Sequence, residues 1–266
     1  MNFFNLYYIK EEGTMKELTF ILSLLPYVLF SQSYAFEVDK DKGAIEYIYV
    51  LSDNNVFKIS NSIDEVYIFN EESIAREYLK TLDEDLLPKD EFQDGGQDGG
   101  ITIFIDNATD VDYYTATNYY GSKGQIESIN NIAFTYVPDY SYNESKGTIG
   151  NLTSIGGLKI THIPVYSYNV KSKKAGKIES IGDKDFEYEP WSTWGEGVGM
   201  VGLPTKAGAI DIKYYETDYH DGFKGKIRSI GNIEFTYYGN TYTNKNADIV
   251  GKFESQTGND TRLVVH

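Results

Sequence analysis

The sequence predicts a mainly β protein: an antiparallel meander of tandem β-hairpins of about 26 residues, curled into a barrel-like or face-packed sheet, with one helix near residues 70–87. Two observations carry this prediction. One motif recurs at nearly constant spacing through most of the C-terminal two thirds of the chain. Within each copy, apolar and polar residues alternate as they do on the two faces of a strand. Such a sheet must hide its apolar face, either by closing on itself or by packing against another layer.

The repeated motif is clearest at residues 225–238, which read GKIRSIGNIEFTYY. Further copies begin at Gly124, Gly150 and Gly176, a degraded copy at Gly202, and a half copy at Gly251. The serine position of the motif is occupied by Ser128, Ser154, Ser180, Lys206, Ser229 and Ser255, at intervals of 26, 26, 26, 23 and 26 residues. A fixed period of this length is typical of a repeat architecture.

Each copy of the motif predicts one hairpin with a three-residue loop, which is 230–232 in the clearest copy. This register places Ile227 opposite Phe235 on the apolar face and makes Arg228 and Glu234 a cross-strand ion pair. A two-residue loop would set Arg228 beside Phe235 and mix the two faces, so the three-residue loop is favoured. The last loop position is then expected to be left-handed.

The chain begins with an upstream extension and a predicted signal peptide, together residues 1–31. The apolar run Leu18–Phe30 follows a Met-Lys-Glu start at Met15, and small polar residues follow it, with cleavage expected after Ser31 or Ala35. The alternatives are a buried strand or a transmembrane helix, but the run is shorter than the roughly 20 apolar residues that a span needs. The pattern therefore predicts export to the periplasm, the cell surface or the medium.

An N-terminal segment of strands and one helix, residues 32–94, is predicted to precede the repeat array. Residues 43–51 read as a strand and 56–69 as a hairpin. The helix at 70–87 is expected to begin at the cap Asn70. Its apolar stripe comprises Ile74, Tyr78, Leu79, Leu82 and Leu86, and we expect this stripe to dock on the sheet.

A polar, glycine-rich linker at 88–100 leads into the array, which spans 95–266 and is expected to form one continuous domain with the N-terminal segment. Residues 101–106 and 111–120 read as strands that precede the first hairpin. The connections between hairpins are longer than the hairpin turns.

Composition excludes several classes of function. The 266 residues contain no cysteine, which rules out disulfides and cysteine-ligated metals. Forty acidic and 24 basic residues give a net charge of −16, which argues against nucleic acids and anionic membranes as partners. The chain is also rich in tyrosine, with 24 residues, as expected for half-buried strands.

The copies of GKIRSIGNIEFTYY resemble the tandem β-hairpin repeats of secreted proteins of Bacteroidetes-type bacteria, over about half of the chain. The resemblance implies export and a hairpin array but no activity. The likeness to Tyr-Asp repeats of the RHS type is fainter, because these copies lack the Tyr-Asp after the second strand and have a longer period.

Four acidic residues of one hairpin are candidates for a metal site. The predicted register puts Glu179, Asp185, Glu187 and Glu189 on the polar face, with Glu179 directly opposite Asp185. Because like charges in that arrangement destabilise a sheet, a bound Ca²⁺ could offset them, as could Lys159 or solvent. Ca²⁺ is the one cofactor considered.

Aromatic residues in a connection are candidates for ligand binding. Trp191 and Trp194 lie in the connection PWSTWGEG, where they could stack on a sugar, anchor a protein partner or cover the end of the apolar face. The chain has no GxSxG or HExxH motif. We therefore expect an exported, non-enzymatic β-repeat protein with a structural, surface or binding role. The alternative is a secreted carbohydrate-active hydrolase or carbohydrate-binding module.

Overall fold

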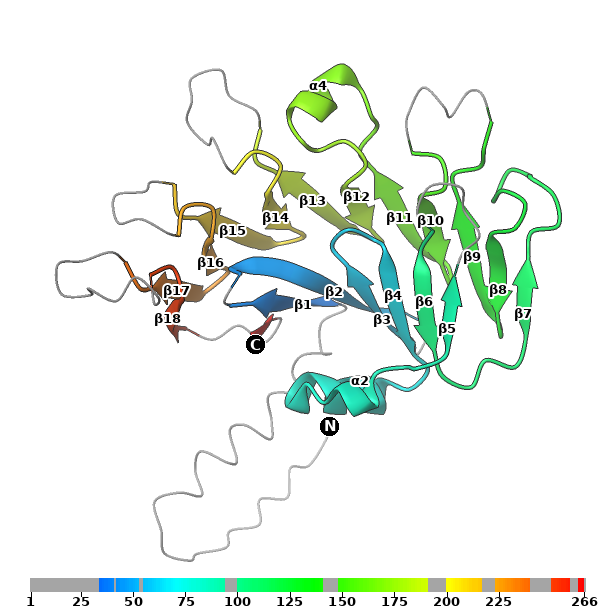
Figure 1. The fold of residues 1–266 in the computed structure, drawn as a ribbon, viewed down its shortest axis with the longest axis horizontal. Helices are drawn as coiled ribbons and strands as arrows, with labels where there is room; N and C mark the ends of the chain where they lie inside the picture. The colour runs from blue at the N-terminus through cyan, green and yellow to red at the C-terminus, as the bar shows by residue number, and fades with distance from the viewer. Residues whose placement is uncertain are drawn as a thin grey trace, which may run out of the picture.

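The computed structural model describes residues 34–40, 42–52, 55–93, 100–140, 148–190, 200–216, 223–239, 250–258 and 263–265. They form two β-sheets and short helices (Figure 1). Both sheets are dominated by antiparallel neighbours, which confirms the predicted fold class.

The first sheet is built mainly by the N-terminal segment. Its seven strands run in the order β19-β1-β2-β3-β4-β6-β5. The pairings of β4 with β6 and of β1 with β19 are parallel, and the others are antiparallel. The strands are β1 (Tyr34–Asp39), β2 (Ala44–Ser52), β3 (Asn55–Ser60), β4 (Glu65–Phe69), β5 (Glu91–Gln93), β6 (Thr102–Ile105) and β19 (Leu263–Val265). The predicted strand at 43–51 and hairpin at 56–69 are thereby confirmed.

The second sheet is the repeat array, whose twelve strands pair in sequence order from β7 to β18. Its two end strands do not pair with each other, so the sheet does not close into a barrel. The strands are β7 (Val111–Tyr113), β8 (Ile126–Ile129), β9 (Ile132–Tyr136), β10 (Leu152–Ile155), β11 (Leu158–His162), β12 (Ile178–Ile181), β13 (Lys184–Tyr188), β14 (Pro204–Ala207), β15 (Ile210–Tyr214), β16 (Ile227–Ile230), β17 (Ile233–Tyr237) and β18 (Phe253–Thr257).

The hairpins have two-residue turns, so the predicted three-residue loop is wrong. In the clearest copy, Ile230 pairs with Ile233 and Ser229 pairs with Glu234. The predicted cross-strand pair of Arg228 and Glu234 therefore does not form. The first residue of each turn is left-handed, with positive φ at Asn130, Gly156, Gly182, Gly208 and Gly231, whereas among these turns the last residue is left-handed only at Gly157. A two-residue hairpin with positive φ at its first turn position favours glycine there.

A β-bulge explains how the two-residue turn keeps the faces separate. Between β15 and β16, Lys213 pairs with Ser229 but Tyr214 pairs with Ile227, so Arg228 has no residue opposite it. This extra residue shifts the alternation by one place, and Ile227 and Ile230 are both buried although they are three residues apart. The same shift recurs in six strands, where the extra residues are Glu127, Thr153, Glu179, Thr205, Arg228 and Glu254.

The two sheets pack face to face around the main hydrophobic core. Phe57 of β3 and Phe235 of β17, for example, are fully buried in the same cluster. The turn edge of the array approaches the first sheet closely, since a Cβ on Gly156 would lie 3.3 Å from the Phe57 ring. Figure 1 shows the array curving around one face of the first sheet. Of the two predicted solutions, the protein therefore uses the face-packed one.

Helix α2 (Glu72–Thr81) covers the other face of the first sheet, as predicted, but it is shorter than 70–87. It ends at Leu82, which is left-handed with φ of 51°, and a short 3-10 turn at Glu84–Leu86 follows. The expected cap Asn70 instead donates its amide to the Asp106 carbonyl at 3.0 Å. The buried side chains of the helix are Ala75, Tyr78 and Leu79, whereas Ile74 of the predicted stripe is exposed.

Three further differences from the prediction concern the repeat array and the strands that precede it. The predicted strand at 111–120 is limited to Val111–Tyr113. A short helix that was not predicted, α4 (Ser167–Lys171), lies in a connection between hairpins. Strand β6, which lies beyond residue 95, belongs to the first sheet.

In the described part of the chain, no helix combines the length and apolar character that crossing a membrane requires.

Candidate functional site

The repeat sheet has two chemically different edges. The two-residue turns lie at one edge, and the connections between hairpins lie at the other because antiparallel strands alternate in direction. We call this second side the loop edge. Its described residues are 114–125, 137–140, 148–151, 163–177, 189–190, 200–203, 215–216, 223–226, 238–239 and 250–252.

The loop edge carries most of the strongly exposed aromatic side chains among the described residues. Tyr119 is 79% exposed, and Tyr120 and Tyr168 are each 59% exposed. Tyr140 and Tyr166 are also exposed, as is Val170. These residues belong to three consecutive connections. Aromatic residues are enriched at binding interfaces relative to the rest of a protein surface.

The first of these connections holds its tyrosines on a hydrogen-bonded turn. The rings of Tyr119 and Tyr120 meet edge to face at 5.6 Å. Asn118 accepts the backbone N–H of Tyr120 at 2.8 Å and donates its own backbone N–H to Gly121. Gly121 lies against the ring of Tyr114, so closely that a Cβ there would approach the ring to 2.5 Å. The exposed pair is therefore displayed by an ordered loop.

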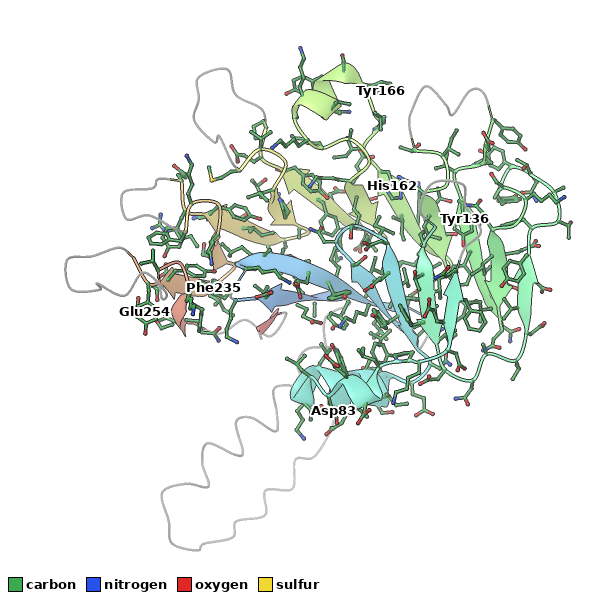
Figure 2. The ribbon with its side chains drawn as sticks, in the orientation of Figure 1. Asp83, Tyr136, His162, Tyr166, Phe235 and Glu254 are labelled. Carbon is green, nitrogen blue, oxygen red and sulfur yellow. The ribbon has the colours of Figure 1, made fainter. Side chains whose placement is uncertain are left out.

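The third connection displays its aromatic residues from α4. Tyr166 precedes the helix and Tyr168 lies in its first turn. The side-chain amide of Asn169 donates to the Pro164 carbonyl at 2.7 Å, and the backbone N–H of Lys174 donates to the Asn169 carbonyl at 2.9 Å. Figure 2 shows Tyr166 beside α4, at the opposite end of the molecule from Asp83 next to α2.

An aromatic or imidazole ring closes several hairpins beneath these connections. The hydroxyl of Tyr188 donates to the Ile178 carbonyl at 2.7 Å, and Tyr214 donates to the Pro204 carbonyl at the same distance. Burial raises the pKa of Tyr188 well above its usual value. At the equivalent position His162 places Nε2 2.7 Å from the Leu152 carbonyl. These contacts tie the last residue of each hairpin to its first strand, so the connections start from fixed points.

A polar groove of about 720 Å³ lies where the loop edge meets the first sheet. One wall is formed by residues 44–47 of β2 and the β3–β4 turn, 60–65. The other wall is formed by Asn151 and residues 175–178, which end the connections that carry Tyr140 and Tyr166. The groove and the exposed tyrosines therefore draw on the same two connections.

The β3–β4 turn gives the groove a rigid wall. The carboxylate of Asp64 accepts the hydroxyls of Ser60 at 2.6 Å and Ser62 at 2.5 Å. These hydrogen bonds lower the pKa of Asp64, so the side chain stays ionised at neutral pH. The Thr102 backbone N–H donates to the Asp64 carbonyl at 2.8 Å, which ties the turn to β6.

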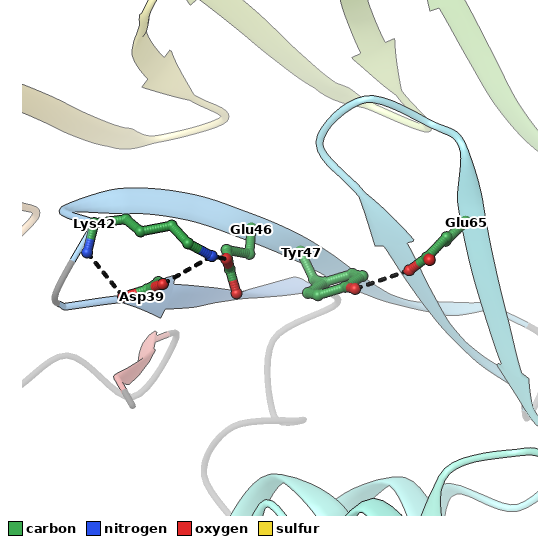
Figure 3. Close-up of polar contacts among 5 residues, drawn as sticks. All are labelled: Asp39, Lys42, Glu46, Tyr47 and Glu65. Atoms are coloured by element: carbon green, nitrogen blue, oxygen red, sulfur yellow. Dashed lines mark hydrogen bonds and ion pairs between the residues drawn. The ribbon is translucent and has the colours of Figure 1, made fainter.

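The other charged groups of the groove already have partners. Glu65 accepts the hydroxyl of Tyr47 at 2.9 Å, and Glu46 pairs with Lys42 at 2.5 Å (Figure 3). By contrast, the side-chain amides of Asn61 and Asn151 form no hydrogen bond with any other described residue. Each amide can offer both donors and an acceptor to a ligand.

The four acidic residues proposed as a metal site are not arranged as predicted. Glu179 is the bulge residue of β12, and Ser180 rather than Glu179 pairs with Asp185. Glu187 instead faces Lys206, with 3.3 Å between the carboxylate and the ammonium. Glu189 follows β13. Among the described residues, no three Asp, Glu, His or Cys side chains come together in a group that could hold a metal ion.

Trp191 and Trp194 lie outside the described residues. The described ends of the connection that contains them, residues 189–190 and 200–203, adjoin β13 and β14. The neighbouring tyrosines were missed by the sequence analysis. The sequence signal for these tyrosines is the occurrence of aromatic pairs, such as Tyr119-Tyr120, within otherwise polar connections. Residues 111–120 had instead been interpreted as a strand because their side chains alternate in character.

A second unusual cluster is buried under α2 and is inaccessible to a ligand. The ammonium of Lys58 lies 3.1 Å from the Glu37 carboxylate and 2.6 Å from the Tyr78 hydroxyl. The ring of Tyr47 is 4.0 Å from this ammonium, and those of Tyr49, Tyr67 and Tyr78 also surround it. Burial lowers the pKa of Lys58. The cluster fixes α2 to the first sheet.

Comparison with known proteins adds no assignment. Neither a protein-family model, nor a curated protein, nor a solved structure matches this chain.

Proposed function

We propose that this chain is an exported, non-enzymatic binding protein that contacts its partner through the loop edge of the repeat array. The observation that carries the proposal is the display of exposed tyrosines from three consecutive connections, two of which also line a polar groove. Export rests on the apolar run Leu18–Phe30 and its flanking residues.

Tyrosine suits such a surface for physical reasons. It offers a large contact area with only two rotatable side-chain bonds, so little conformational entropy is lost on binding, and its hydroxyl tolerates water when the partner is absent. The connections are held by the hairpin-closing contacts of Tyr188, Tyr214 and His162, which reduces the cost of ordering the loops. The charge of −16 favours partners that are neutral or basic.

The proposal is tested with residues 32–266, the chain after cleavage at Ser31, on an array of surface glycans and proteins. The test variant is the triple substitution Tyr119→Ala, Tyr166→Ala and Tyr168→Ala, and the matched control is Ile74→Ala, which removes an exposed apolar side chain from α2. We expect the triple variant to lose tenfold or more in affinity, roughly the effect of 1.4 kcal/mol, and the control to bind like the wild type.

Two results would count against the proposal. If the triple variant and the wild type bind equally well and melt at the same temperature, the loop edge is not the binding surface. Release of reducing ends from any bound glycan would show that the protein is a hydrolase, which contradicts the non-enzymatic part of the proposal.

A further inference from the structure

We infer that the partner of the loop edge is an uncharged polysaccharide chain, which runs across successive connections and inserts sugar units into the groove between Asn61 and Asn151. This inference rests on the proposed function and adds the class of ligand. Three features of the described surface carry it: the spacing of the aromatic residues, the chemistry of the groove and the sign of its charges.

The aromatic residues are arranged for an extended ligand. Successive connections are separated by two strands, which places them about 10 Å apart along the loop edge. Tyr119, Tyr140 and Tyr166 occupy three consecutive connections and are therefore two such steps apart from first to last. A chain of sugar rings presents a stackable face at regular intervals of this order, and aromatic side chains stack on such faces.

The surroundings of the tyrosines are polar rather than apolar. Asn118 and Ser122 flank the first exposed pair, Asp139 precedes Tyr140, and Asn169 lies within α4. Exposed rings in a hydrophilic surface match a ligand whose own surface alternates between C–H faces and hydroxyl groups. This pattern therefore favours a carbohydrate over an apolar peptide or lipid.

The groove offers hydrogen-bonding groups for hydroxyls. Asn61 and Asn151 line the groove from its two walls, and their amides have no partners in the part of the chain that the structure describes. The carboxylate of Asp64 is held in place by two serine hydroxyls and keeps further lone pairs for ligand hydroxyls. A volume of about 720 Å³ lies within the usual range for small-molecule sites, roughly 300–1,000 Å³.

The negative charges of the groove repel an acidic ligand, and they do not require a cationic ligand to balance them. Glu46, Asp64 and Glu65 line it against the single cation Lys177. The Lys177 ammonium lies over the Tyr188 ring, 5.3 Å from its centre, in the same arrangement as Lys226 over Tyr237, so its role is to cover the hairpin-closing ring. All three carboxylates already accept hydrogen bonds or pair with a lysine. An uncharged ligand fits best.

The inference is tested by affinity electrophoresis of residues 32–266 in gels containing galactomannan, xyloglucan, arabinoxylan or mixed-linkage glucan, with polygalacturonate and chitosan as charged comparisons. We expect at least one neutral polymer to retard the protein and polygalacturonate not to do so, whereas any retardation by the cationic chitosan should disappear as salt is raised, because it would reflect the net charge of −16. The double variant Asn61→Ala and Asn151→Ala should weaken the retardation tenfold or more, and Ile74→Ala should not change it. Because uncharged ligands make no ion pairs, the dissociation constant should not depend on salt concentration.

The possible failures are distinguishable. Retardation by polygalacturonate or chitosan alone, or by no polymer, overturns the assignment to an uncharged polysaccharide. If the glycan and protein array then reveals a different partner whose binding the tyrosine triple variant abolishes, the proposed binding surface stands without this ligand class. If the asparagine variant melts at a lower temperature than the wild type, its weaker binding no longer tests the groove. The salt dependence of the wild-type dissociation constant then tests the ligand class, and a steep loss of affinity with rising salt contradicts an uncharged ligand.

Discussion

At the residue scale, the most consequential interaction is the buried ion pair of Lys58 and Glu37. Their side chains are 3% and 4% exposed, and the pair lies between the first sheet and α2. An ammonium removed from water needs compensation, which here comes from the carboxylate, the Tyr78 hydroxyl and the faces of the surrounding tyrosine rings. Removing either partner leaves the other charge buried and uncompensated.

We therefore predict that Lys58→Met alone or Glu37→Leu alone lowers the free energy of unfolding by about 3–5 kcal/mol. The double variant should recover most of this loss, because no unpaired charge remains and the new side chains are apolar. Urea denaturation of the four proteins gives the coupling energy directly. Additive single effects would show that the two charges do not depend on each other.

Buried tyrosines also predict how stability changes at alkaline pH. Burial raises the pKa of Tyr188 and Tyr214 in the folded protein above the ordinary value of about 10. The folded state therefore binds more protons than the unfolded state above pH 10, and the free energy of unfolding should fall as pH rises through that window. The lowered pKa of Lys58 acts in the opposite direction below its unfolded value of 10.5, but it is one group against several tyrosines.

The alkaline prediction is checked by following tyrosinate absorbance and circular dichroism together from pH 8 to pH 13. The buried tyrosines should ionise only as the secondary structure is lost, and the melting temperature should decrease steadily above pH 10. Ionisation of every tyrosine near pH 10 with the fold intact would contradict the assignment of these hydroxyls to the core.

At the element scale, the bulge is the device that makes a hairpin of this motif amphipathic. The apolar positions of β16 and β17 are Ile227, Ile230, Ile233, Phe235 and Tyr237, all of which are buried. Strict alternation cannot place Ile227 and Ile230 on one face. The extra residue Arg228 permits it by adding one place to the strand.

Deletion of Arg228 is predicted to destabilise the protein strongly. Without the bulge, Ile227 turns toward solvent, and exposing a buried isoleucine costs at least about 2 kcal/mol. The control Arg228→Ala keeps the backbone length and should change stability by no more than about 0.5 kcal/mol. Thermal unfolding of the deletion variant and of Arg228→Ala tests this prediction. Equal melting temperatures of the two variants would mean that the bulge does not determine which side chains of the strand face the core.

The same bulge explains what the sequence could and could not predict. The repeats, the hairpins, the helix and the mainly β class follow from periodicity, and all are confirmed. The register was misplaced because alternation through Ile227, Ser229 and Ile233 seemed to require a three-residue loop, whereas a bulge produces the same faces with two. The predicted Glu179–Asp185 contact depended on that register and is wrong for the same reason.

The candidate site was predicted only in part. Loop aromatics near the edge of the array were expected from Trp191 and Trp194, and the described tyrosines extend that idea to other connections. The groove was beyond prediction, because it joins the β3–β4 turn to residues 175–178 of a distant connection. Contacts between segments so far apart in the chain arise from the packing of the two sheets and leave no local pattern.

At the scale of the whole molecule, both sheets contribute to one hydrophobic core. The array buries its apolar face against β1 to β6, and the first sheet is covered on its other face by α2. The turn between β1 and β2 also reaches the array, where the Ile227 backbone N–H donates to the Gly43 carbonyl at 3.0 Å. Neither sheet can leave the other without exposing an apolar face.

This arrangement predicts that the array cannot fold alone. Residues 100–258, expressed without β1 to β5, α2 and β19, should aggregate or lack a cooperative thermal transition, because one whole face of the sheet would be exposed. The full chain should unfold in a single transition. Calorimetry and size-exclusion chromatography test both statements, and a soluble array fragment with its own sharp transition would contradict the shared core.

Binding of the partner at the loop edge is tested most directly by hydrogen–deuterium exchange. The protein is saturated with the neutral polysaccharide that retards it most strongly, and exchange is compared with that of the free protein. We predict slower exchange in residues 114–125, 163–177 and 60–65, and unchanged exchange in α2 at 72–81. Protection confined to α2 or to strands away from the loop edge would contradict binding at this surface.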